Sequence, residues 1–318
     1  MEFWRLSFPL IDRYDHVVTG TASQGWDGLA LGDSTLIAGD VYGYSGFALA
    51  EQPALRIETC VTNLVLRDPR MVAAAAATLW RMSGGRFDLG VGRGDSALHL
   101  LGIPPPSFDT FAASIEQLSD ALVEQGVRPG EGPTLEISAS GPRVAKLAAR
   151  ATDGVILAMG TSPEVLGPLI QELRAEREAA GRDGLRITVL LPIGVDTPDL
   201  PGHEIIRGSV ATFANIAVRG RVRFLSAYFT EERADELREA YEYQGHSHAT
   251  AKHAEVLTAE EIGRYGVVGS VERCAERIRE LRDLGVDRVI VIGGSRDEYD
   301  RRMRNEATVL TEVAPLVR

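Results

Sequence analysis

Residues 57–92, IETCVTNLVLRDPRMVAAAAATLWRMSGGRFDLGVG, contain the pattern on which the fold assignment depends. An apolar run rich in β-branched residues is followed by a helical run that begins at Asp68-Pro69 and stops at Gly84-Gly85, and a second apolar run comes next. An aspartate N-cap, a proline at the first helical position and a glycine after the last one are typical helix boundaries. This segment therefore predicts a strand–helix–strand unit.

The same alternation extends to both ends of the chain, and it predicts parallel strands joined by crossover helices. Eight such units in about 300 residues fit a closed barrel better than an open sheet. The expected fold class is therefore α/β, a (β/α)8 TIM barrel forming one domain over residues 1–318. The expected strands are 3–8, 28–31, 55–63, 87–92, 134–138, 155–159, 185–195 and 288–292. The expected helices are 12–24, 44–51, 68–82, 109–124, 142–152, 163–179, 271–284 and 298–313.

One interval breaks this rhythm. Residues 196–269, called the insertion below, separate the seventh strand from its helix and far exceed the usual loop of about two to six residues. Helical patterns occur within it at 207–219 and 231–243. An insertion at this point lies above the C-terminal mouth of a barrel, where binding and catalytic groups collect. A lid is the expectation, and a packing or dimerisation segment is the alternative.

Composition narrows the class of protein. The chain of 318 residues has a net charge of −11, which argues against a nucleic-acid or anionic membrane partner. Its two cysteines, Cys60 and Cys274, lie far apart without metal-ligand spacing, so we expect a reduced cytoplasmic protein without a metal site. The first residues do not have the pattern of a signal peptide, and no apolar window is long enough to cross a bilayer.

A glycine motif marks the end of the fourth expected strand, in the pattern Gly90-x-Gly92-x-Gly94. Glycines at a strand end allow the backbone to approach a flat ring or a phosphate, or to adopt positive φ. No acidic residue follows at the distance that a dinucleotide-binding fold requires. Asp95 comes directly after the motif, where a carboxylate serves to exchange a proton, to orient a cofactor, or merely to cap the next turn.

Two further positions follow strand ends. Asp33 comes after the second expected strand, either as an acidic group at the barrel mouth or as part of a turn. Ser140-Gly141-Pro142 precedes the helix expected at 142–152, and free amides at a helix N-terminus favour an anion. The alternative is that this sequence only opens the helix.

Five motifs occur in an order that resembles the bacterial luciferase-like flavin and deazaflavin oxidoreductases. They are TCVTN at 59–63, SGGRFDLGVGRGDS at 83–96, ASGPR at 139–143, ATDG at 151–154 and YGVVGSVERC at 265–274. Within that family the sequence is most similar to the branch around methylenetetrahydromethanopterin reductase and the actinobacterial enzymes that use coenzyme F420.

The resemblance implies hydride transfer between coenzyme F420, a deazaflavin, and a small organic substrate, in a homodimeric enzyme. It implies Asp95 and Asp33 as catalytic residues, and a non-proline cis peptide between Cys60 and Val61. The phosphate tail is expected at the loops after strands five and six. The implied cofactor-binding residues are Asp33, Thr59, Cys60, Val61, Asn63, Gly92, Gly94, Asp95, Ala139, Ser140, Gly141, Pro142, Gly160 and Thr161.

The alternatives differ in cofactor or in class. An FMN-dependent monooxygenase or reductase has similar motifs, and a non-catalytic flavin-binding barrel and a phosphosugar lyase or isomerase share the fold. Ser34 stands where many relatives have a histidine, which leaves the substrate chemistry of that position open. His246 and His248, in the insertion, are expected as solvated loop residues or as groups that face the substrate.

Overall fold

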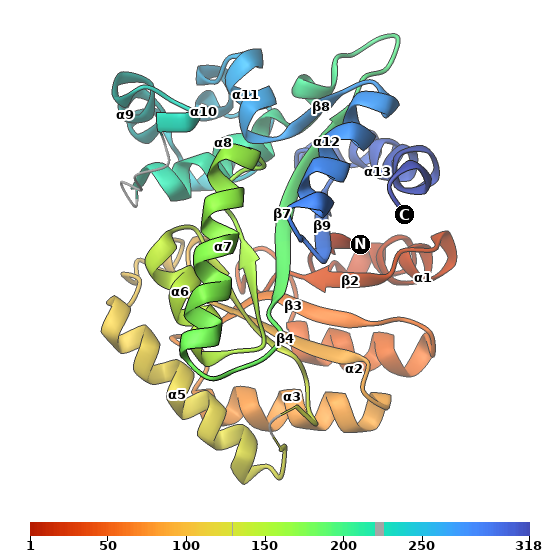
Figure 1. The fold of residues 1–318 in the computed structure, drawn as a ribbon. Coiled ribbons are helices and arrows are strands. Elements are labelled where there is room, and N and C mark those ends of the chain that lie inside the picture. Colours follow the sequence, from red (N-terminus) through yellow and green to blue (C-terminus); the bar gives the residue numbers. More distant parts are fainter. Residues whose placement is uncertain (129, 220–225) are drawn as a thin grey trace.

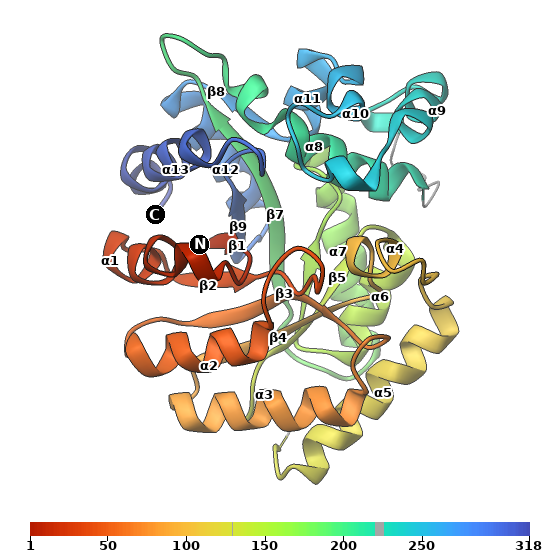
Figure 2. The same ribbon diagram turned by 180° about the vertical axis from the view of Figure 1, so that it is seen from behind.

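The protein forms a closed barrel of parallel strands (Figures 1 and 2). The computed structural model describes residues 1–128, 130–219 and 226–318. Its strands pair in the order β1-β2-β3-β4-β5-β6-β7-β9, and β9 returns to β1, so the (β/α)8 prediction is confirmed. The barrel strands are β1 (Glu2–Ser7), β2 (Gly28–Leu31), β3 (Ile57–Asn63), β4 (Phe87–Gly92), β5 (Leu135–Ala139), β6 (Gly154–Leu157), β7 (Arg186–Val195) and β9 (Arg288–Ile292).

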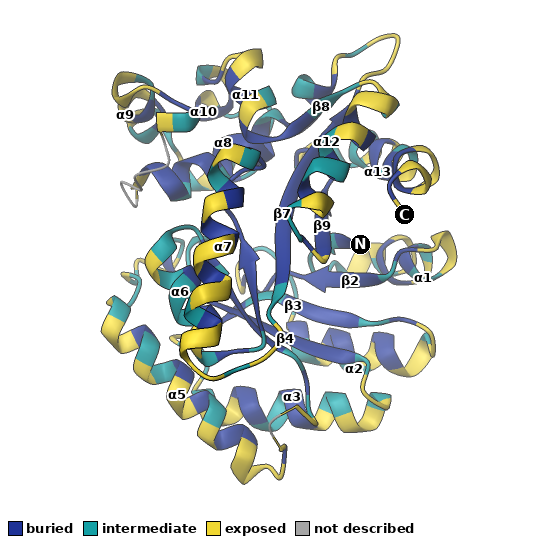
Figure 3. Cartoon of the chain, in the orientation of Figure 1, coloured by how far each residue is buried: buried dark blue, intermediate teal, exposed yellow. Residues whose placement is uncertain are grey.

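Helices alternate with these strands and surround the barrel (Figure 1). Strands β7 and β9 are buried along almost their whole length, whereas helices such as α5 and α7 keep one exposed face (Figure 3). The helices are α1 (Gly20–Gln24), α2 (Val41–Glu51), α3 (Pro69–Ser83), α4 (Ser96–His99), α5 (Phe108–Glu124), α6 (Pro142–Ala151), α7 (Pro163–Ala179), α8 (Gly202–Arg219), α9 (Glu231–Ala240), α10 (Lys252–Val256), α11 (Ala259–Tyr265), α12 (Val271–Asp283) and α13 (Tyr299–Thr308). Short 3-10 and π turns at 11–19 and 309–316 extend α1 and α13.

Local chemistry sets the helix boundaries. The Asp68 carboxylate accepts a hydrogen bond from the Arg70 amide at 2.9 Å, and Gly84 ends α3 at φ 70°, as the sequence predicts. Helix α2 begins three residues earlier than expected, because the Asp40 carboxylate accepts from the Gly43 amide at 2.7 Å and so caps the first turn.

A short strand inside the insertion was missed from the sequence. Strand β8 (Val267–Gly269) pairs with Ile193–Val195, the last three residues of β7, beyond the part of β7 that pairs with β6 and β9. Helices α8 and α9 correspond to the two predicted helical patterns, while α10 and α11 were not predicted. Helices α8–α11 lie beside the C-terminal part of β7 in both views (Figures 1 and 2). Residues 220–225 of the insertion lie outside the described residues.

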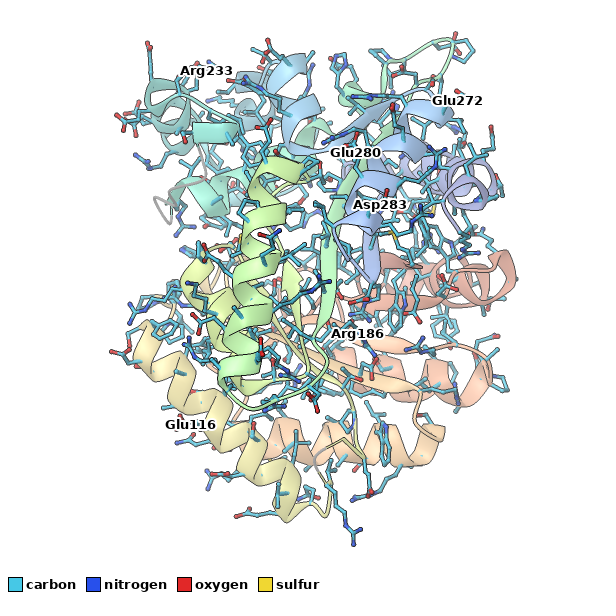
Figure 4. All side chains as sticks on the ribbon, viewed as in Figure 1. Glu116, Arg186, Arg233, Glu272, Glu280 and Asp283 are labelled. Carbon is cyan, nitrogen blue, oxygen red and sulfur yellow. The ribbon has the colours of Figure 1, made fainter. Side chains whose placement is uncertain are left out.

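Charged side chains fill the N-terminal part of the barrel interior. Arg288 Nη2 lies 2.6 Å from Glu58 Oε2 and 2.9 Å from Glu136 Oε1, and the guanidinium stacks on the Trp4 ring at 4.5 Å. Arg186, at the start of β7 (labelled in Figure 4), also contacts Glu136, at 3.1 Å. Burial raises the pKa of Glu58 well above its ordinary value, against the attraction of Arg288. The contacts among these four side chains account for the burial of polar groups here, and we assign them a structural role.

Candidate active site

A cavity of about 400 Å³ opens at the C-terminal ends of the barrel strands. Its lining combines the ends of β2–β5, part of the insertion and the segment after β9. The insertion contributes mainly helix α8 and the pair His246-Ser247. Leu6, Phe8 and Leu190 are among the residues that give it an apolar surface. This volume and mixed lining are typical of a small-molecule site.

The structure brings together most, but not all, of the predicted cofactor-binding residues. Those that line the cavity are Asp33, Cys60, Val61, Asn63, Gly92, Gly94, Asp95 and Ser140. Those that do not are Thr59, Ala139, Gly141, Pro142, Gly160 and Thr161. Thr59 is fully buried one residue before the lining, where its hydroxyl donates to the Gly90 carbonyl at 2.8 Å and accepts from the Gly90 amide.

Strand β3 presents its backbone to the cavity at Cys60 and Val61. The peptide bond between them is cis, as the family resemblance implied. The pairing of β3 with β4 shifts register between Thr59 and Thr62. A Cβ on Gly92 would lie 2.6 Å from Val61 Cγ2, so only glycine fits opposite this part of β3. The absence of a Cβ at Gly92 therefore makes room for the Val61 side chain, and the predicted approach of this backbone to a flat ring or a phosphate stays a prediction.

The carboxylate of Asp95 is held by side chains rather than by the turn that follows it. Its Oδ1 accepts hydrogen bonds from Tyr243 Oη at 3.1 Å and Arg219 Nη1 at 3.3 Å, and it lies 3.5 Å from His99 Nδ1. No side-chain cap to the amides of helix α4 is formed, which argues against the turn-capping alternative. Burial raises the pKa of Asp95, while His99 and Arg219 oppose that shift.

Asp33 is enclosed by donors. Arg67 contacts both of its oxygens, with Nε 3.0 Å from Oδ2 and Nη2 3.2 Å from Oδ1, and the Thr62 hydroxyl donates to Oδ2 at 2.7 Å. Arg67 also reaches Asp40 at 2.8 Å and stacks on Tyr42 at 5.1 Å. Asp33 thus lines the cavity as a carboxylate whose charge is already balanced by a cation.

The loops expected to hold a phosphate differ from each other. Ser140 lines the cavity before helix α6, whereas Gly160 is packed against Tyr228 of the insertion, whose ring would lie 2.7 Å from a Cβ at that position. The Tyr228 hydroxyl accepts from the Ser162 amide at 3.1 Å, and Thr161 donates to the Tyr265 carbonyl. Of the two loops, only the one at Ser140 is open to a ligand in this arrangement.

Of the two insertion histidines expected in a solvated loop, His246 is buried and His248 is half-buried. His246 is buried and lines the cavity, and its Nδ1 lies 2.7 Å from Tyr241 Oη. Burial lowers the pKa of His246 to about 3. His248 Nε2 accepts from Arg296 Nε at 3.1 Å. Next to both, Ser247 has a positive φ of 61° and its amide donates to Thr212 at 2.9 Å.

Sequence reasoning missed the groups that surround the two aspartates. Arg67 had a usable signal, since it lies within the stretch that links the TCVTN motif to helix α3. Tyr243 and Arg219 had none, because they are 148 and 124 residues from Asp95 and reach it only through the packing of the insertion. In the described part of the chain, no cluster of three or more His, Cys, Asp or Glu residues is arranged to hold a metal ion. No described helix is both long enough and apolar enough to span a membrane.

A barrel with a cavity that opens at its C-terminal mouth and a partly buried carboxylate in the cavity wall has the form of a small-molecule enzyme. Residues 13–288 match the model of the luciferase-like monooxygenase family. The chain belongs to this family, as its motifs predicted.

Curated relatives are similar over different parts of the chain. A phthiodiolone/phenolphthiodiolone dimycocerosates ketoreductase of Mycobacterium tuberculosis is 28% identical over 165 residues, 45% of this chain and 43% of the relative, so the match spans under half of that protein. A 5,10-methylenetetrahydromethanopterin reductase of Archaeoglobus fulgidus is 25% identical over 79% of this chain and 80% of its own length. An F420-dependent glucose-6-phosphate dehydrogenase of Nakamurella multipartita is 30% identical over 43% of this chain and 48% of its own.

Solved structures share the fold over the whole chain. A coenzyme F420 dependent tetrahydromethanopterin reductase from Methanopyrus kandleri superposes with a TM-score of 0.76 at 18% identity, covering 100% of this chain and 99% of the other. An F420-dependent secondary alcohol dehydrogenase superposes with a TM-score of 0.71, also at 18% identity, covering 100% and 99%.

Proposed function

We propose that this protein is an oxidoreductase that uses coenzyme F420 to exchange a hydride with a small organic substrate. One observation carries the proposal: Asp95, a partly buried carboxylate, lines the same cavity as the backbone at the ends of β3 and β4. Relatives named for F420 or for methylenetetrahydromethanopterin favour the same cofactor.

The residues present suit a flat, polar-edged ring with an anionic tail. Cys60, Val61 and Gly92 provide a surface of backbone and small side chains against which a ring system packs. Among the described residues, the buried Ser34 hydroxyl has no hydrogen-bond partner, and it lines the same cavity. An unpaired hydroxyl at a cavity wall is ready to meet a polar edge of a ligand. Ser140, at the N-terminus of α6, is placed to receive an anion.

Bound there, the deazaflavin supplies or accepts the hydride, and the protein's part is to orient the reactants, exclude water and move a proton. Asp95 is the group proposed to exchange that proton, because a partly desolvated carboxyl with a raised pKa is protonated closer to neutral pH. Asp33 is proposed to hold a polar edge of the cofactor while Arg67 balances its charge. Homodimer formation and a cytoplasmic location are proposed on the family resemblance and on the cysteine usage.

FMN remains the second candidate cofactor, since the family is named for luciferase-like monooxygenases. A turnover assay distinguishes an enzyme from a binding protein. The protein is mixed either with reduced F420 and a panel of ketones and aldehydes, or with oxidised F420 and the matching alcohols. The absorbance of the deazaflavin is followed in both cases. We expect at least one pair to react at a rate that Asp95→Asn lowers. Binding of cofactor without turnover in either direction would favour the non-catalytic alternative.

A further inference from the structure

The insertion and the β4 loop meet at a single atom of Asp95. Tyr243 lies just after α9 and Arg219 ends α8, yet both donate to Oδ1, at 3.1 and 3.3 Å. His99, on α4, brings its Nδ1 to 3.5 Å from the same oxygen. Two donors from the insertion thus converge on one carboxylate oxygen, while His99 lies close by with its Nδ1 2.9 Å from the backbone carbonyl of Asp95.

The other oxygen of Asp95 is left open. Within the described residues, Oδ2 accepts no hydrogen bond. It is also not one of the unpartnered side-chain oxygens that are fully buried, and 25% of the Asp95 side chain is exposed. Asp95 also lines the cavity. The carboxylate is therefore anchored through Oδ1, while Oδ2 remains accessible to a ligand or to water.

Tyr243 is itself held in place by its neighbours. Its ring stacks on His99 with centroids 4.5 Å apart and planes within 6°. The Arg219 guanidinium lies 5.3 Å from the ring centroid, and Tyr241 packs against its edge at 5.2 Å. A phenol fixed on several sides presents its hydroxyl in one position, so the hydrogen bond to Asp95 needs little reorganisation.

We propose that Tyr243 and Arg219 are positioning residues for Asp95: they anchor Oδ1 and favour the ionised carboxylate, so that Oδ2 is the atom that exchanges a proton with the substrate. This assignment rests on the proposed function for the role of the proton, but the anchoring itself does not depend on a cofactor. It makes the insertion part of the acid–base site rather than only a cover.

The electrostatic direction follows from the groups that face Asp95. These are His99 on α4, Arg219 on α8, and Tyr243 and Tyr241 after α9. Burial raises the pKa of Asp95, and the charge of Arg219 and the presence of His99 oppose it. A hydrogen bond from Tyr243 to the ionised form also lowers the proton affinity of the carboxylate. Loss of either Tyr243 or Arg219 therefore leaves burial less opposed and shifts the titration upward.

The test uses the full chain without cofactor, labelled with ¹³C at the aspartate carboxyls and titrated by NMR. We expect Tyr243→Phe to move the midpoint of Asp95 upward by about half a pH unit or more, and Arg219→Gln to move it further, because a charge is removed as well as a donor. Tyr241→Phe is the matched control, since the Tyr241 hydroxyl contacts Thr212 and His246 instead of Asp95. Arg219→Lys keeps the charge, so we expect its Asp95 midpoint to stay close to the wild-type value.

A second measurement separates this proposal from the proposed function. In an enzyme that turns over F420, the midpoint in the pH profile of kcat/KM, which reports the free enzyme, moves in the same direction as the NMR midpoint, while cofactor affinity changes by no more than about twofold. If no turnover is found, the NMR shift still decides the anchoring. The proposal is overturned if the Asp95 midpoint in folded Tyr243→Phe and Arg219→Gln stays within about 0.2 pH unit of the Tyr241→Phe value, a difference worth only about 0.3 kcal/mol.

Discussion

Arg67 and Asp33 form a two-pronged ion pair at the wall of the cavity. Both carboxylate oxygens are engaged, at 3.0 and 3.2 Å, and the Thr62 hydroxyl adds a third contact at 2.7 Å. The side chain of Asp33 is only 4% exposed, whereas that of Arg67 is 30% exposed. Arg67 therefore neutralises a carboxylate that the cavity wall would otherwise bury alone.

Removal of Arg67 tests this relationship. Arg67→Met keeps much of the side-chain volume but leaves the Asp33 charge without its cation, and we expect unfolding free energy to fall by about 2–4 kcal/mol. Urea unfolding measures the change. Arg70→Met serves as the control, because Arg70 pairs with Asp68 at the surface and little effect is expected there. Equal stability of the two variants would contradict the structural role assigned to Arg67.

Asp95→Asn keeps the shape of the side chain and removes its ability to exchange a proton. We expect kcat to fall by about 10²–10⁴ with little change in cofactor affinity. Steady-state kinetics and a fluorescence titration of the cofactor measure the two quantities. Near-normal turnover would leave Asp95 with a structural role only.

Cys60 is expected to matter for its size rather than for its thiol. It lines the cavity, and burial raises the pKa of the thiol well above its ordinary value, so the reactive thiolate is scarce near neutral pH. Cys60→Ala and Cys60→Ser should keep most activity, while Cys60→Leu should abolish cofactor binding by filling the cavity. Loss of activity in Cys60→Ala with cofactor binding intact would point to thiol chemistry instead.

His246 is expected to stay neutral well below pH 6. Burial lowers its pKa to about 3, below the ordinary 6.5 of an unfolded chain. As the pH falls, the imidazole of His246 is therefore protonated in the unfolded chain before it is protonated in the folded protein. The free energy of unfolding decreases as pH falls from about 6.5 toward 3, with a slope of up to about 1.4 kcal/mol per pH unit. Ring ¹⁵N shifts report its charge, and urea unfolding of His246→Gln should show a shallower acid dependence than the wild type. A midpoint near pH 6.5 for His246 in the folded wild-type protein would contradict the prediction that burial keeps this imidazole neutral.

The barrel was predictable because its signals are local and repeated. Caps such as Asp68 and Gly84 and the alternation of apolar runs identify each unit without reference to the rest of the chain. Strand β8 lacked such a signal, since three residues that pair only with the tip of β7 are too short for a periodic pattern. The glycines at 92 and 94 were also predictable as special positions: a Cβ on Gly92 would collide with the Val61 side chain, and Gly94 adopts a positive φ of 90°.

The candidate site was predictable only on its barrel side. The motif residues after β2, β3, β4 and β5 meet at the cavity because the C-terminal ends of parallel strands lie on one face. Contacts from the insertion depend on tertiary packing, which is why Tyr243 at Asp95 and Tyr228 at Gly160 were not foreseen. For the same reason His246, in a polar stretch of sequence, proved to be buried.

The choice between F420 and FMN is decided by cofactor binding to the apo-protein. The protein is stripped of any bound ligand and titrated separately with F420 and with FMN, using fluorescence or calorimetry. We predict an F420 dissociation constant in the low micromolar range or tighter, and FMN binding at least about tenfold weaker, a difference of roughly 1.4 kcal/mol. Stoichiometric FMN retained through purification, with no binding of F420, would contradict it.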